Sequence, residues 1–248
     1  MTGQFPYLLR AVQWARELSL GVMVDLHGLP GSQNGDDHSG RVGTPLYATN
    51  GTNLDRALGV LRNLTEEFTR AEYGGAVQAI EVMNEPRLFS NGDASFTMPY
   101  LKDTYAQASV VIRSVAAAAG MTVTIHDAFW GSNYWRGYDP SGDDNNGSGR
   151  GQSPDWLQLD VHEYYAFAPR QNLPRDQIIG QWPESPLTAI RRYKLTARHP
   201  ADSICNTSRL LKSTSSGRPG TVVGEWSLET GASADLVMRS HCNRKPDC

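Results

Sequence analysis

The sequence contains no long hydrophobic run and no excess of positive charge. No apolar stretch approaches the roughly 18–20 residues that a membrane span requires. Lysine and arginine number 23 and aspartate and glutamate 26, which gives a formal net charge of −3. No cluster of basic residues accompanies this balance, so we expect neither a nucleic-acid partner nor binding to a membrane. The first six residues also lack the basic start and apolar stretch of a secretory signal peptide.

Cysteine is scarce and its number is odd. Cys205, Cys242 and Cys248 cannot all pair within one chain, and none lies in a Cys-x-x-Cys or Cys/His pattern typical of zinc sites. Either they are inert or unpaired thiols, or their partners lie outside this chain. The glycines that follow Leu26 lack the spacing of a phosphate-binding loop, so the sequence gives no indication of a nucleotide.

Short apolar runs alternate with amphipathic stretches along the chain. Helical spacing predicts helices at residues 6–19, 52–70, 99–119, 186–198 and 202–213. The apolar runs, which are typical of strands buried on both faces of a sheet, lie at residues 21–28, 76–84, 121–127, 157–164 and 221–226. This alternation predicts an α/β fold with a parallel sheet.

Every predicted strand ends in polar residues that can do chemistry. They are His27, Glu85, His126, His162 with Tyr164, and Glu225. Polar groups at the carboxyl ends of successive strands are typical of a (β/α)8 barrel (TIM barrel). A doubly wound sheet would more often carry a glycine-rich phosphate loop. Only about five of the eight barrel strands are found, so we expect an incomplete barrel that could self-associate through its open sheet edges.

Two short motifs each place a glutamate at a predicted strand end. Residues 84–86 (Asn-Glu-Pro) follow the second predicted strand, and residues 224–226 (Gly-Glu-Trp) end the last one. Either motif alone is equally well explained by a turn or a surface glutamate. Two carboxylates at the ends of separate barrel strands fit glycoside hydrolysis, in which one protonates the leaving oxygen and the other attacks the anomeric carbon.

An aromatic and an imidazole side chain accompany the second glutamate in this interpretation. His162 and Tyr164 alternate on one predicted strand, so their side chains point to the same face. From there Tyr164 could hold the nucleophile by a hydrogen bond.

Several segments together resemble one known family. They are DLHGLPGSQNGDDHSG (residues 25–40), IEVMNEP (80–86), IHDAF (125–129), DVHEY (160–164) and VGEWS (223–227). The chain resembles glycoside hydrolase family 5 in these segments, and within it the fungal exo-β-1,3-glucanase branch (glucan 1,3-β-glucosidases). The resemblance implies a (β/α)8 barrel and a retaining hydrolase that needs no cofactor and no metal.

The resemblance also assigns roles, residue by residue. It implies that Glu85 is the general acid/base and Glu225 the nucleophile. Asn84 would bind the sugar 2-hydroxyl. The subsite where the bond breaks would be lined by His27, His162 and Tyr164. Trp226 and Phe167 would form a sugar-stacking wall, with packing inside the barrel as the alternative for Trp226.

The resemblance sets further expectations for the whole chain. The partner would be a β-glucan oligo- or polysaccharide, and the location extracellular or in the cell wall. We expect a partial catalytic domain at residues 1–227 and an atypical tail at 228–248, the family domain being truncated at both ends. An arginine and a tryptophan of the family site would then lie outside the chain, so a non-catalytic fragment or sugar-binding relic is the alternative. Asp36 stands where this branch tends to have phenylalanine, which leaves β-1,4-glucan or mannan open as substrate.

Overall fold

The fold is known from a computed structural model, which describes residues 3–88, 95–116, 120–142, 153–164 and 220–227. These residues fall into two compact units. The first contains the described residues up to Val161 together with 220–222, and the second contains residues 162–164 and 223–227. The predicted helices at 186–198 and 202–213 and the tail at 228–248 lie outside the described residues.

The described chain alternates helices and strands, as the sequence predicts. The helices are α1 (Phe5–Glu17), α2 (Gly51–Phe68) and α3 (Met98–Ala116), with short 3₁₀ helices η1 (Asp37–Ser39) and η2 (Ala71–Tyr73). The strands are β1 (Val22–Asp25), β2 (Val77–Glu81), β3 (Thr122–His126), β4 (Leu157–Tyr164) and β5 (Gly220–Ser227). They form one five-stranded sheet in the order β1-β2-β3-β4-β5. The first four strands pair in parallel, so the predicted α/β class is confirmed.

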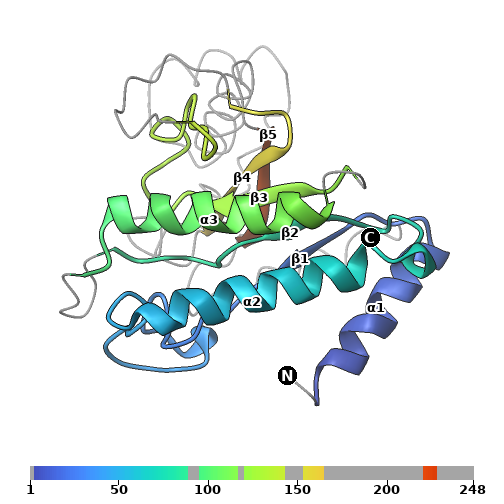
Figure 1. The fold of residues 1–248 in the computed structure, drawn as a ribbon, viewed down its shortest axis with the longest axis horizontal. Coiled ribbons are helices and arrows are strands. Elements are labelled where there is room, and N and C mark those ends of the chain that lie inside the picture. Colours follow the sequence, from blue (N-terminus) through green and yellow to red (C-terminus); the bar gives the residue numbers. More distant parts are fainter. Residues whose placement is uncertain (1–2, 89–94, 117–119, 143–152, 165–219, 228–248) are drawn as a thin grey trace, which may run out of the picture. The chain divides into compact units, whose positions relative to one another are not determined.

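The core of the first unit lies between the sheet and the two long helices. Helices α2 and α3 lie side by side, and they contact β2 and β3 respectively (Figure 1). Their inward faces carry the apolar residues Leu61, Leu64, Phe68, Leu101, Tyr105 and Ile112, all of which are buried. Each such side chain stabilises the fold by about 1.5–3 kcal/mol relative to exposure. No helix among the described residues is both long and apolar enough to span a bilayer.

The second strand is shorter than its apolar run. The pattern predicts a strand over residues 76–84, but β2 ends at Glu81. The next backbone bond, from Val82 N to Thr124 O at 3.0 Å, is the last one to β3. The chain then leaves the sheet, and Glu85 adopts a positive φ of 43°. Residues 82–85 are nevertheless all buried, and side chains of the loop after β1 bond the carbonyls of Asn84 and Glu85, which the alternation pattern alone does not reveal.

Candidate active site

The loop that follows β1 is folded tightly around glycines. A Cβ on Gly28 would lie 2.6 Å from the Ser39 carbonyl oxygen. Gly31 has a φ of +86°, and a Cβ there would lie 2.8 Å from the Leu46 carbonyl carbon. A side chain at either position would collide with backbone, and at Gly31 it would also be strained. These glycines therefore let residues 28–40 fold back over the end of β2.

Two buried amide side chains of this loop hold the residues after β2. Gln33 Nε2 donates to the His27 carbonyl at 2.9 Å and to the Asn84 carbonyl at 2.7 Å. Its Oε1 accepts from Leu29 N at 3.0 Å, so the amide links the loop to the chain after β2. Asn34 Nδ2 donates to the Glu85 carbonyl at 3.1 Å. Because buried polar groups need such partners, these bonds fix the backbone at Asn84 and Glu85.

Glu85 itself is held in an unusual backbone conformation with its side chain nearly buried. Its positive φ lies in a region that non-glycine residues rarely adopt. Its Oε2 lies 3.2 Å from His38 Nε2. Strained residues of this kind persist only where the surroundings enforce them, and they cluster at functional sites. The strain at Glu85 and its enforcement by the loop therefore mark it as a candidate functional carboxyl.

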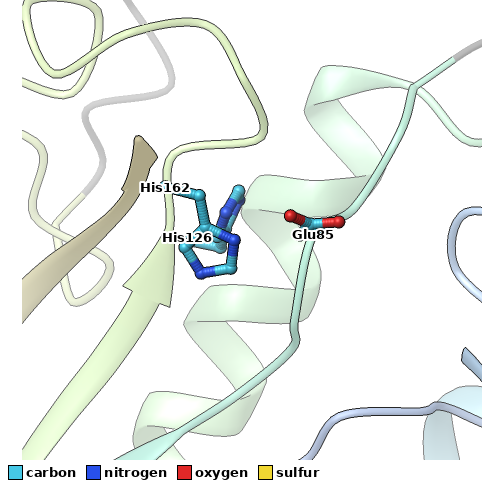
Figure 2. Close-up of side chains that lie close together, drawn as sticks. All are labelled: Glu85, His126 and His162. Carbon is cyan, nitrogen blue, oxygen red and sulfur yellow. The ribbon is translucent and has the colours of Figure 1, made fainter. Parts of the chain in front are cut away.

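A second imidazole, that of His126, reaches Glu85 from the end of β3. One of its ring nitrogens lies within 4.8 Å of a Glu85 carboxylate oxygen, and Figure 2 shows both side chains. His126 Nδ1 accepts a hydrogen bond from Ala128 N at 3.0 Å, which leaves the ring proton on Nε2. The buried phenol of Tyr105 donates to the His126 carbonyl at 2.8 Å. Burial raises the pKa of Tyr105 well above its usual value, so this donor stays protonated.

His27, which is predicted to line the same site, follows β1 and lies next to His38. Its Nδ1 is 2.6 Å from Asp25 Oδ2, so the carboxylate orients the ring. The ring also meets that of His38 edge-on, with centroids 5.8 Å apart. About half of the His27 side chain is exposed, and that part is accessible to a ligand.

Glu225, in the second unit, is held by two side chains among the described residues. The Tyr164 hydroxyl donates to Glu225 Oε2 at 2.6 Å. His162 Nδ1 lies 3.6 Å from the same oxygen, and its side chain is buried. A short bond from a phenol to a carboxylate is of the strong, charge-assisted kind and fixes the orientation of the carboxyl group. The second unit thus brings together His162, Tyr164 and Glu225, three of the residues that the sequence analysis singled out.

The remaining predicted site residues differ in their placement. Asn84 is buried, and its Nδ2 has no hydrogen-bond partner among the described residues, so this donor can serve a ligand. Trp226, on β5, is 68% exposed, so its indole is not part of the buried core. Phe167 lies outside the described residues.

Sequence reasoning missed three side chains that surround Glu85. They are Gln33, Asn34 and His38, all from the loop between β1 and α2. The available signal was a pair of amides among closely spaced glycines, because amides in a tight loop often bond the backbone.

The chain is similar in sequence to known glucan 1,3-beta-glucosidases. A glucan 1,3-beta-glucosidase of Blumeria graminis is 32% identical over 235 residues, which are 95% of this chain and 44% of that protein. A glucan 1,3-beta-glucosidase of Schwanniomyces occidentalis is 38% identical over 133 residues, or 54% of this chain and 29% of that protein. The chain is related to the glucan 1,3-beta-glucosidases of glycoside hydrolase family 5. It spans less than half the length of these relatives. No family model matches the chain.

A solved structure supports the fold. The rutinosidase of Aspergillus niger superposes with a TM-score of 0.55 over 92% of this chain and 66% of that one, at 17% identity. At this identity the likeness bears on the fold alone. Together with the sheet order, it confirms the predicted fold as an incomplete (β/α)8 barrel.

Proposed function

We propose that this chain carries the two catalytic carboxylates of a retaining β-glucan hydrolase. The observation that carries the proposal is the 2.6 Å bond from the Tyr164 hydroxyl to Glu225, because it orients one carboxylate. A nucleophile has to be held in such a fixed orientation towards the carbon that it attacks. The second carboxyl, Glu85, is nearly buried beside His38, whereas Glu225 is about a third exposed and accepts a hydrogen bond from a phenol. Retaining hydrolysis requires two carboxyls in different protonation states.

The reaction proceeds in two displacements. Glu85 gives its proton to the glycosidic oxygen while Glu225 attacks the anomeric carbon, so the leaving sugar departs as an alcohol and a glycosyl ester forms on Glu225. Glu85, now a carboxylate, takes a proton from water, and the resulting hydroxide displaces Glu225. The sugar is released with its original anomeric configuration, and both carboxyls return to their starting states.

Substrate contacts come from residues around each carboxyl. The buried Asn84 amide is a donor for a sugar hydroxyl, and the exposed edge of His27 is accessible to the same sugar. The exposed Trp226 offers an indole face on which a pyranose ring can stack.

The substrate we propose is a β-1,3-glucan, because the curated relatives are named for this linkage. Asp36 stands at the position where a phenylalanine is expected in this branch. Its Oδ2 lies 3.2 Å from Arg87 Nη2, so the two side chains form an ion pair. This departure leaves β-1,4-glucan or mannan open as the second candidate. An extracellular or wall-bound location, with residues 1–227 as the catalytic part, fits action on such a polymer.

The test is sugar release from laminarin by the chain and by its Glu225→Gln variant. We expect release by the parent and a loss of at least about 1,000-fold in the variant, because the amide cannot form the glycosyl ester. Laminari-oligosaccharide binding, measured by calorimetry, should survive the substitution. Binding without release by the parent would contradict the proposal and support a sugar-binding protein instead. Faster release from β-1,4-glucan or mannan than from laminarin would correct the substrate.

A further inference from the structure

His38 lies against the carboxyl that the proposed reaction uses as its acid. It belongs to η1, in the glycine-rich loop, and its Nε2 is 3.2 Å from Glu85 Oε2. About a third of the His38 side chain is exposed, whereas that of Glu85 is nearly buried. The sequence analysis gave this histidine no role.

The hydrogen bonds of Asn34 determine which nitrogen of His38 carries the proton. Asp36 N donates to Asn34 Oδ1 at 2.9 Å, which assigns the other amide atom as nitrogen. That nitrogen, Nδ2, has two hydrogens: one goes to the Glu85 carbonyl at 3.1 Å, and the other to His38 Nε2 at 3.1 Å. His38 Nε2 is therefore an acceptor, and the ring proton lies on Nδ1, which faces Asp37 Oδ1 at 3.7 Å.

A neutral imidazole nitrogen with a lone pair favours the protonated form of a neighbouring carboxyl. The single lone pair of Nε2 already accepts from Asn34 Nδ2, so an O–H group of Glu85 shares it in a three-centre bond, whereas a carboxylate oxygen would be repelled by it. The titratable groups that face His38 are Asp37 on its own helix, Glu85 after β2 and the ring of His27 after β1. His126, on the neighbouring strand, has the opposite tautomer, because its Nδ1 is the acceptor.

We propose that His38 is a positioning residue that holds Glu85 protonated and oriented before the glycosidic bond breaks. The inference rests on the proposed function. When the glycosidic oxygen replaces His38 Nε2 as acceptor, the Glu85 O–H bond breaks, its electron pair stays on the carboxylate and the proton goes to the leaving oxygen. His38 keeps its hydrogen bond from Asn34 throughout.

Leaving-group dependence separates this role from a purely structural one. The variants are His38→Phe, which removes the acceptor, and His38→Gln, which keeps an acceptor oxygen; Arg41→Gln on the same loop is the control. On laminaribiose, whose leaving group needs a proton, kcat/KM should fall about 10-fold in His38→Phe, the effect of one lost hydrogen bond. On 2,4-dinitrophenyl β-glucoside, which needs no acid, it should change less than about 2-fold. His38→Gln should recover part of the loss in kcat/KM on laminaribiose. If His38→Phe lowers kcat/KM equally on both substrates, the proposal is overturned.

A second readout does not depend on activity. Nitrogen-15 spectra of the histidine rings of the full chain, recorded at mildly alkaline pH, should show His38 with its proton on Nδ1. The signal of His38 is assigned as the one that disappears in His38→Phe. Glu85→Gln should shift its Nε2 resonance. A proton on Nε2 of His38 would overturn the inference even in an active protein. If the chain hydrolyses no glycoside, the proposed function fails, while the tautomer still decides whether His38 holds Glu85 in this way.

Discussion

The two candidate catalytic carboxyls are held in contrasting ways. Glu85 is fixed through its backbone: the loop amides bond the carbonyls of Asn84 and Glu85, and its φ is positive. Glu225 lies on a regular strand and is fixed through its side chain, by Tyr164 and His162. The side chain of Glu85 is 10% exposed and that of Glu225 33%. The difference fits their proposed roles, because an acid/base must change its protonation state while a nucleophile must stay ionised.

The largest effect should follow removal of the acid/base. Glu85→Ala should lower kcat/KM on laminarin by about 100- to 10,000-fold, the usual contribution of general acid catalysis. Added azide should restore turnover of an activated aryl glucoside, because this small anion can enter the space left by the carboxyl and attack the glycosyl ester. The product expected by nuclear magnetic resonance is the β-glycosyl azide. An α-azide would instead indicate an inverting reaction.

The next effect is on stability and tests the backbone-held side of the comparison. Gln33→Met keeps the length of the side chain but leaves the carbonyls of His27 and Asn84 without their donor. We expect the free energy of unfolding to fall by about 3 kcal/mol, since each buried unsatisfied group costs about 1–3 kcal/mol. Urea unfolding of the parent and the variant measures this free energy. Gln107→Met, at an exposed position of α3, is the matched control and should change it by less than about 0.5 kcal/mol. A small loss in Gln33→Met would mean that the loop does not hold Glu85.

The smallest effect tests the side-chain-held carboxyl. Tyr164→Phe removes the donor to Glu225, and hydrogen bonds to charged groups contribute about 1.5–3 kcal/mol. We therefore expect kcat/KM to fall about 10- to 100-fold with little change in urea unfolding. Tyr7→Phe, on the exposed face of α1, should leave the rate unchanged. If Tyr164→Phe destabilises the protein as much as Gln33→Met does, the contrast between the two sites is wrong.

The sequence predicted the positions of the five strands because each overlaps a short apolar run, although β1 and β2 are shorter than their runs. It placed Glu85 and Glu225 correctly near strand ends, and it predicted that His162 and Tyr164 share a face. Their shared contact with Glu225 follows from the two-residue alternation of β4.

The surroundings of Glu85 could not be predicted in the same way. They depend on contacts across 51 positions of sequence, from Gln33 and Asn34 to Asn84 and Glu85. The positive φ of Glu85 has no local sequence signal either, because nothing at this position favours a left-handed backbone except the loop that enforces it. The role inferred for His38 depends on which atom of the Asn34 amide faces it, and only three-dimensional contacts define this.

The most direct test of the central claim is covalent labelling with an activated 2-deoxy-2-fluoro-β-glucoside. Fluorine at carbon 2 slows both displacements, and a good leaving group restores the first, so the glycosyl ester accumulates. Peptide mass spectrometry of the labelled chain should place the sugar on Glu225, and the Glu225→Gln variant should stay unlabelled. A sugar on Glu85 or on another carboxylate, or hydrolysis of laminarin with no ester formed, would contradict the assignment of the two roles.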